Sequence, residues 1–342
     1  MIEPRRIVVV GYHAAELIDI ACVTSALVMA NWLRRSALYD PTVATPGGRP
    51  IVCGSGLTLQ AESALERVTG PVDTVLVSGG IGHVQAAADP VLVAHVRRLA
   101  RDARRVASVC TGAGILAASG VLDGRRAATH WFHADDLAAS YPQVCFDPAP
   151  IYIRDGNLAT SAGVTSALDL TLSFIEEDGG ADLARSVARH MVTYLQRPGN
   201  QAQMSVFTSA PSAAGDVVRR VVDRITADPG GDLTTANLAA VAGVSERHLT
   251  RLFLQDLGET PGRFVRRARV EAAAHLLVTT ALTVERIAVR CGFGSAESLR
   301  QAFTTRYGVA PSHYRRTQSA TGGATTPGRG SGVDPLAVQL AR

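Results

Sequence analysis

The sequence predicts two domains of different class: an α/β domain built on a parallel sheet, followed by an all-α domain with two helix-turn-helix motifs. Three observations lead to this prediction. Short apolar runs alternate with helical patterns over about the first 200 residues, a segment near the C-terminus repeats itself at an offset of about 50 residues, and the patterns stop between these two parts. The chain has 342 residues, of which 46% are hydrophobic, so it is long enough to bury two separate cores.

The first part of the chain carries strands and helices in regular alternation. Apolar runs typical of buried strands cover residues 7–10, 73–78 and 105–109, and helical patterns follow them at residues 18–34, 89–104 and 112–120. A strand pair at residues 151–153 and 158–160 then leads into helices at residues 164–178 and 180–195. Strands and helices in this order indicate a parallel sheet with helices on both faces.

Two segments without these patterns set the domain limits. Residues 197–215 form a linker pattern, and residues 317–342 are too rich in small and polar residues to bury a core. We therefore expect domains at residues 1–196 and 216–316, followed by a disordered tail. Five cysteines without a C-x-x-C spacing indicate reduced thiols, and the start of the chain has no secretory signal pattern, so we expect a cytoplasmic protein.

The repeat near the C-terminus consists of two copies of a helix-turn-helix pattern. The first copy begins at Leu238 with LAAVAGVSERHLTRLF, and the second begins at Ile287 with IAVRCGFGSAESLRQAF. In each copy a small residue, a turn glycine and a capping serine stand in the order that two closely packed helices require. Two copies of one supersecondary unit indicate that the unit itself carries the function, and we place the motifs at residues 233–257 and 283–306.

The second helix of each motif is expected to read DNA. Ser245 and Ser295 are placed to cap these helices, and apolar residues at helical spacing must face inward. Arginine matches guanine, glutamine matches adenine, and a carboxylate can accept a hydrogen bond from cytosine. We expect base contacts from Arg247, Thr250, Arg251, Glu297, Arg300 and Gln301, and phosphate contacts from Ser245, Arg263, Ser295, Arg315 and Arg316.

The charge distribution agrees with these motifs. All 34 basic residues are arginine, and residues 216–316 hold 15 of them against 10 acidic residues. A local basic excess favours phosphate binding, and it makes affinity fall as salt rises. Between the motifs, residues 262–280 have the apolar spacing of one continuous helix, roughly 25 Å long. One protomer could therefore read two successive major grooves.

Residues 216–316 resemble the AraC family of transcription regulators, and the segment GFGSAESLRQAFTTRYGVAPSHYR is similar to the family's signature. The resemblance implies a seven-helix DNA-binding domain with recognition helices at residues 245–257 and 295–306. Ala296 and Ser298 are shorter than the residues that other members often carry there. The second recognition helix is therefore expected to contribute more through phosphates than through bases.

One group of residues in the first domain has the pattern of a chemical site. The strand RVASV runs directly into Cys110, and a helix pattern begins right after it, so the cysteine should stand on a sharp strand-to-helix turn. A helix N-terminus lowers the pKa of a thiol and leaves it exposed. Gly79 and Gly80 could present backbone amides to the same place, and Asp19 could arrive from the first loop.

This domain resembles the ThiJ/PfpI group of amidotransferase-like domains over residues 5–210. The segment SVCTGAGILAASGVLDGRRAATHW is close to that group's nucleophile segment, and VSGG, TSAGVTSALDL and RPGNQAQMSVF also fit. The resemblance implies a flavodoxin-like parallel sheet, and together with the AraC-type domain it implies a regulator of the GlxA type. Thr111 stands where hydrolytic members carry a histidine, and TSAGVTSALDL lacks the histidine of glutaminase relatives, which implies a non-catalytic domain.

Three alternatives remain open at this stage. Cys110, Thr111 and Asp19 would reproduce the residues of one hydratase branch, and Cys110 could instead be a redox sensor. A third alternative is a metal site formed by His130, His133, Asp135 and Asp136. The ordinary interpretation of these residues is that an aspartate caps a helix and the histidines pack against their neighbours.

Taken together, the sequence predicts a DNA-binding transcription regulator, an activator, controlled by a small metabolite in the first domain. The residues expected to hold that metabolite are Asp19, Gly79, Gly80, Cys110, Thr111 and His130. The expected partners are double-stranded operator DNA, the effector, RNA polymerase and a second copy of the chain, and no membrane. We expect no cofactor and no metal.

Overall fold

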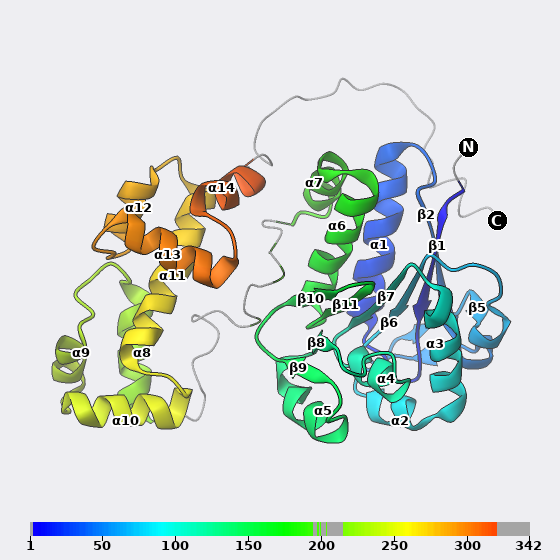
Figure 1. The fold of residues 1–342 in the computed structure, drawn as a ribbon, viewed down its shortest axis with the longest axis horizontal. Coiled ribbons are helices and arrows are strands. Elements are labelled where there is room, and N and C mark those ends of the chain that lie inside the picture. Colours follow the sequence, from blue (N-terminus) through cyan, green and yellow to red (C-terminus); the bar gives the residue numbers. More distant parts are fainter. Residues whose placement is uncertain (1–2, 194–196, 198, 200–202, 204–214, 320–342) are drawn as a thin grey trace. The chain divides into compact units, whose positions relative to one another are not determined.

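The computed structural model describes residues 3–193, 197, 199, 203 and 215–319 (Figure 1). These residues form two compact units, one ending at residue 203 and one beginning at residue 215, and each is described by itself. Most of the expected linker at residues 197–215 and of the expected tail at residues 317–342 lies outside the described residues.

A seven-stranded sheet forms the centre of the first unit. Its strand order is β10-β11-β7-β6-β1-β2-β5, and neighbouring strands are parallel except β10, which runs antiparallel to β11. The strands are β1 (Arg5–Val10), β2 (Tyr39–Thr45), β5 (Ser63–Ala64), β6 (Thr74–Val77), β7 (Arg105–Val109), β10 (Tyr152–Asp155) and β11 (Leu158–Ser161). Strands β6, β7 and β11 are buried along their whole length, as a sheet covered on both faces requires.

Helices cover both faces of this sheet, as predicted (Figure 1). One layer consists of α1 (Leu17–Arg34), α6 (Thr165–Gly179) and α7 (Ala181–His190), and the other of α2 (His83–Ala88), α3 (Pro90–Asp102) and α4 (Gly112–Ala118). Smaller elements lie outside the sheet: β3 (Ile51–Val52), β4 (Thr58–Leu59), β8 (Arg126–Ala128), β9 (Cys145–Asp147) and α5 (Ala134–Ser140).

Helix α1 has an unusual composition for a helix of this unit. Among the described helices it alone reaches the length and apolarity of a membrane span, with 18 residues and a mean hydropathy of 1.4. It packs against α6, α7 and β2, however, and its Asp19 is fully buried. These are the contacts of a core helix within the α/β unit.

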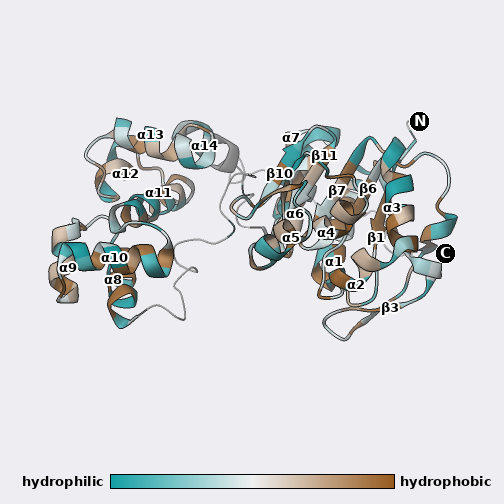
Figure 2. Ribbon diagram, turned by 60° about the horizontal axis from the view of Figure 1, so that its bottom comes forward, coloured by the Kyte–Doolittle hydropathy of each residue, from teal (hydrophilic) through white to brown (hydrophobic). Residues whose placement is uncertain are grey.

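The second unit contains the seven helices that the AraC resemblance implies. They are α8 (Asp216–Ala227), α9 (Thr235–Ala242), α10 (Glu246–Leu257), α11 (Pro261–Thr279), α12 (Val284–Arg290), α13 (Ala296–Tyr307) and α14 (Pro311–Ser319). The predicted continuous helix between the motifs is α11, and its 19 residues span about 28 Å. Helices such as α3 and α10 carry both hydrophobic and hydrophilic residues, as helices packed on one side do (Figure 2).

The seven helices bury two separate cores rather than one. The first core includes Phe253 of α10 and Phe264 of α11, whose rings meet edge to face at 5.9 Å. The second includes Phe303 of α13 and Tyr314 of α14, with ring centroids 5.2 Å apart. Helix α11 contributes its first half to one core and its second half to the other, so it joins two helix-turn-helix subunits.

Candidate DNA interface and sensor site

The first helix-turn-helix forms as its sequence predicts. Helix α9 ends at Ala242 and is capped by Gly243, which adopts a left-handed conformation with φ of 70°. Ser245 caps α10, because its hydroxyl oxygen accepts a hydrogen bond from the backbone N–H of His248 at 3.2 Å. The recognition helix therefore begins at Glu246, one residue after the predicted start.

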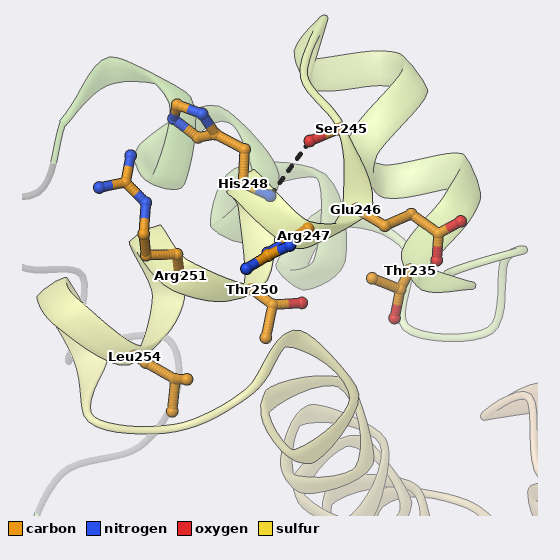
Figure 3. Close-up of a pocket in the computed structure, with 8 residues that line it drawn as sticks. All are labelled: Thr235, Ser245, Glu246, Arg247, His248, Thr250, Arg251 and Leu254. Carbon is orange, nitrogen blue, oxygen red and sulfur yellow. Dashed lines mark hydrogen bonds between the residues drawn. The ribbon is translucent and has the colours of Figure 1, made fainter.

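The outward face of α10 borders an open hollow of about 810 Å³ (Figure 3). Its lining residues are Thr235, Ser245, Glu246, Arg247, His248, Thr250, Arg251 and Leu254. Arg247 and Arg251 lie one turn apart and are exposed, and neither forms an ion pair with any described residue. Their guanidinium groups are therefore available to a ligand outside the chain. His248 shares this face and was not among the residues predicted from the sequence.

The second helix-turn-helix has the same capping but different electrostatics. Ser295 accepts a hydrogen bond from the backbone N–H of Ser298 at 3.1 Å, so α13 begins at Ala296. Arg300 forms ion pairs with Glu285 at 2.9 Å and with Glu297 at 3.7 Å, while Gln301 is exposed. Two predicted base contacts, Arg300 and Glu297, thus bind each other in the free chain. Arg300 has to leave these carboxylates before it can reach a base.

The residues predicted to contact phosphates differ in availability. Arg263 is exposed in the first turn of α11, and Ser245 and Ser295 are exposed caps. Arg315, by contrast, donates hydrogen bonds to the carbonyl oxygens of Leu277 at 3.0 Å and Leu282 at 2.5 Å. Arg315 therefore braces α14 against the end of α11, and two of its nitrogens are already engaged in the free chain. The side chain of Arg316 lies outside the described residues.

The first unit contains the predicted strand-to-helix turn at Cys110. Strand β7 ends at Val109, Cys110 adopts a positive φ of 55°, and α4 begins at Gly112. A Cβ atom on Gly79 would lie 2.3 Å from the Cβ of Cys110, and one on Gly163 would lie 2.1 Å from it. Cys110 therefore fits in this turn only because the two residues that pack against its Cβ, Gly79 and Gly163, have no side chain.

The structure places five of the predicted ligand-binding residues together. The carboxylate of Asp19 accepts hydrogen bonds from the backbone N–H of Gly79 at 3.1 Å and of Val164 at 2.6 Å. The N–H of Gly80 lies 2.9 Å from the hydroxyl of Thr111, which is 3.0 Å from the carbonyl oxygen of the same glycine. The two glycine amides are thus held within the chain, contrary to the expectation that they would present free donors beside Cys110.

The chemistry of Cys110 also differs from the prediction. The residue is only 8% exposed. Burial, followed by the nearby charge of Asp19, raises the pKa of the Cys110 thiol to about 12, so the expected low pKa and exposure are wrong. Hydrogen bonds from Thr111 favour the thiolate, but the loss of hydration outweighs them.

A tyrosine that sequence reasoning missed completes this site. Tyr12 lies two residues beyond the end of β1 and is 3% exposed, and its hydroxyl has no hydrogen-bond partner among the described residues. Burial, followed by the charges of Cys110 and Asp19, raises the pKa of this tyrosine. The signal that could have identified Tyr12 is its position at the carboxyl end of a parallel strand, where ligands bind in such sheets.

His130 is linked to Cys110 by a hydrogen bond of the preceding residue, Thr129. The hydroxyl of Thr129 donates a hydrogen bond to the carbonyl oxygen of Cys110 at 3.0 Å, and His130 follows it. The rings of His130 and His133 are 6.0 Å apart, and those of His133 and His83 are 5.0 Å apart. Burial and then the charge of His133 lower the pKa of His83 and of His130. Within the described residues, no group of three or more histidine, cysteine or acidic side chains is arranged to hold a metal.

The buried carboxyl of Asp19 gives a pH prediction. Burial raises its pKa from 3.8 to about 6, so the folded state binds the proton more tightly than the unfolded state does. The free energy of unfolding should then fall as pH rises from about 4 to about 6, by about 3 kcal/mol, and level off above that. Asp19→Asn lacks this titration, so urea unfolding of both proteins across this range should show the difference between them growing by that amount. A difference that stays constant with pH contradicts the prediction.

Comparisons with known proteins agree with the two units. Residues 5–177 match the DJ-1/PfpI family, and residues 238–317 match a helix-turn-helix domain family. The chain is 31% identical over 290 residues to the HTH-type transcriptional regulator CdhR of Pseudomonas aeruginosa, covering 85% of each chain. It is 30% identical over 303 residues to the HTH-type transcriptional regulator GlxA of Rhizobium meliloti, covering 88% of this chain and 92% of GlxA.

Half of the chain is also similar to an enzyme. The chain is 34% identical over 172 residues to an isonitrile hydratase of Pseudomonas putida, and this match covers 50% of the chain and 72% of the hydratase. The similarity to CdhR and GlxA extends across both units, whereas that to the hydratase covers half of the chain. The chain therefore belongs to the transcription regulators that join an N-terminal DJ-1/PfpI domain to a C-terminal AraC-type helix-turn-helix domain, the group that includes GlxA.

Proposed function

We propose that this regulator is an activator whose DNA binding responds to a small metabolite held beside Cys110. The observation that carries the proposal is a set of hydrogen bonds between the Cys110 turn and Gln203, which precedes residues 204–214 and α8. Through these bonds, a change at Cys110 can reach the part of the chain that leads to the DNA-binding domain. Regulation needs such a route, because a ligand acts only through its different affinity for two conformations.

The route runs through the backbone on both sides of His130. The Thr129 hydroxyl donates to the carbonyl oxygen of Cys110, and the side-chain amide of Gln203 donates to the carbonyl oxygen of Thr129 at 2.7 Å. The N–H of Trp131 donates to the side-chain oxygen of Gln203 at 2.9 Å. Gln203 therefore holds the chain on either side of His130. A ligand that moves Cys110 or His130 also disturbs this clamp.

A second anchor holds the same part of the chain. Arg197 donates hydrogen bonds to the buried carboxylate of Asp169, from its backbone N–H at 2.8 Å and from its guanidinium at 2.7 and 2.9 Å. Arg197 and Gln203 are six positions apart in the chain. In this proposal Arg197 stays attached to Asp169, and Gln203 passes on a conformational change around Cys110. A buried ion pair with several hydrogen bonds is a firm attachment.

The properties of Cys110 argue against catalysis and against redox sensing. Both need a thiolate, and a thiol with a pKa near 12 is almost entirely protonated at neutral pH. The similarity to an isonitrile hydratase keeps an enzyme as the competing function, since Cys110, Thr111 and Asp19 lie together. In that case Cys110→Ala abolishes turnover while DNA binding survives. Redox sensing requires that mild peroxide alter DNA binding in the parent and not in Cys110→Ser.

The proposal extends to the assembly. A homodimer presents four recognition helices to two half-sites of double-stranded DNA, and the ligand changes how the two DNA-binding units are set relative to each other. Activation then follows from contact with RNA polymerase at a neighbouring promoter. All of this takes place in the cytoplasm, on the nucleoid.

The test is a footprint and gel shift on the DNA flanking the gene, with candidate metabolites added. The parent is expected to protect a site whose affinity or extent changes with one metabolite. Cys110→Ala should keep DNA binding and need a different metabolite concentration, and Gln203→Ala should keep binding to both DNA and metabolite but lose the response. A Gln203→Ala variant that responds like the parent removes the proposed route. A protected site that no metabolite alters contradicts the metabolite control.

A further inference from the structure

The two helix-turn-helix subunits meet at a polar contact beside α11. Arg269, near the middle of α11, donates a hydrogen bond from Nε to the carbonyl oxygen of Pro229 and from a terminal nitrogen to that of Gly231, both at 2.9 Å. Pro229 and Gly231 belong to the loop between α8 and α9, which is part of the first subunit. The positive charge strengthens both bonds, because charge-assisted hydrogen bonds are stronger than neutral ones.

The other side of the Arg269 guanidinium faces the second subunit. Gly292, in the turn after α12, adopts φ of 74°, and a Cβ atom there would lie 2.8 Å from the guanidinium carbon of Arg269. In the same place, a Cβ on Gly230 would lie 2.3 Å from the carbonyl oxygen of Arg290. The loop of the first subunit and the turn of the second thus approach each other closely, with Arg269 between them.

These contacts matter because the two subunits have separate apolar cores. Helix α11 contributes to both cores. Long helices bend, however, so α11 by itself fixes the orientation of one subunit relative to the other only weakly. The loop precedes α9, the first helix of the first motif, and the turn lies within the second motif and leads into its recognition helix, α13. A contact that holds this loop and this turn on one guanidinium therefore limits how the two recognition helices can move relative to each other.

We propose that Arg269 is a positioning residue that sets the spacing and rotation of α10 relative to α13, so that the domain reads two major-groove segments at one fixed separation. This inference rests on the proposed use of both recognition helices. It concerns neither a base contact nor a phosphate contact, since both known hydrogen bonds of Arg269 go to backbone carbonyls.

The test uses the full-length protein and duplexes derived from its own footprinted site. One or two base pairs are inserted between the two contacted segments, and each pair moves them apart by about 3.4 Å and rotates them by about 35°. The parent is expected to lose affinity about tenfold with each insertion. Arg269→Met should bind the native spacing about tenfold more weakly and discriminate between spacings less than about threefold.

Three further variants separate positioning from charge and folding. Arg219→Met removes the same charge from α8, where Arg219 pairs with Asp216, and should weaken binding slightly and equally on all spacings. Arg269→Lys keeps the charge without the two-pronged contact and should give intermediate discrimination. Gly292→Ala displaces the guanidinium without removing any charge and should act in the same direction as Arg269→Met.

The outcomes are distinct. A folded Arg269→Met protein that keeps the parent's spacing preference overturns the inference, and if that variant does not fold, an unchanged preference in both Arg269→Lys and Gly292→Ala does the same. A parent that shows no spacing preference at all contradicts the use of both recognition helices, on which the inference rests. Thermal melting of each variant reports whether it is folded.

Discussion

Arg247→Ala and Arg251→Ala are each expected to weaken binding to specific DNA by about 1 to 3 kcal/mol, which is about fivefold to more than a hundredfold in affinity. Both side chains are exposed on the outward face of α10, and neither has an ion-pair partner among the described residues. Their removal therefore costs the fold little, and the loss should appear in DNA binding with an unchanged melting temperature.

The second motif supplies the comparison. Arg300→Ala should cost less affinity than either change on α10, because Arg300 must first leave Glu285 and Glu297. Gel shifts of the three variants on the native site and on sites with single base changes test this order. If both variants on α10 keep the parent's affinity and footprint, the orientation that we assign to this helix is wrong.

A phosphate contact should behave differently from these base contacts. Arg263, at the exposed start of α11, is a candidate of this second kind. Its loss should lower affinity on all sequences alike and reduce the salt dependence, whereas the α10 variants should lose discrimination at particular base pairs. The two kinds of contact are therefore separable in one set of titrations.

The features that local sequence determines were predictable. Capping of α10 by Ser245 and of α13 by Ser295 depends on residues three positions apart, and the fifty-residue repeat revealed both motifs. The same holds for the turn at Cys110, because a strand pattern running straight into a helix pattern leaves no room for a longer loop. Strand β2 (Tyr39–Thr45) was missed because its sequence, YDPTVAT, contains an acid and a proline instead of an apolar run.

The features that were missed depend on contacts between distant residues. The pKa of Cys110 follows from its burial between Gly79 and Gly163 and from the charge of Asp19, which lies 91 positions earlier in the chain. Arg315 is held by carbonyl groups of Leu277 and Leu282, more than thirty residues before it. A single sequence does not show which distant partners a charged or reactive side chain will meet. The sequence therefore predicted which residues lie together around Cys110, but not the burial and the raised pKa of its thiol.

The largest stability effect is expected from Asp178→Ala, at the end of the sheet opposite Cys110. The Asp178 carboxylate is 1% exposed and accepts hydrogen bonds from Arg105 at 3.2 Å, from Arg104 at 2.9 Å and from the Tyr39 hydroxyl at 3.1 Å. The Arg105 side chain is 3% exposed, and its guanidinium lies 4.1 Å from the centre of the Phe174 ring. Removing the carboxylate leaves this buried cation with one pairing partner, the half-exposed Glu177, so the α/β unit should lose about 3 to 5 kcal/mol.

Urea unfolding can separate this effect from a simple loss of surface charge. Glu177→Ala removes a neighbouring carboxylate that is 42% exposed and should cost less than about 1 kcal/mol. Replacing the pair together, as Arg105→Met with Asp178→Leu, should recover most of the loss, because the penalty comes from an unpaired buried charge. The DNA-binding unit has cores of its own, so its unfolding should not change. A loss no larger for Asp178→Ala than for Glu177→Ala would mean that Asp178 does not hold the sheet together. Cys110 lies at the other end of β7, so we do not expect its surroundings to depend on these ion pairs.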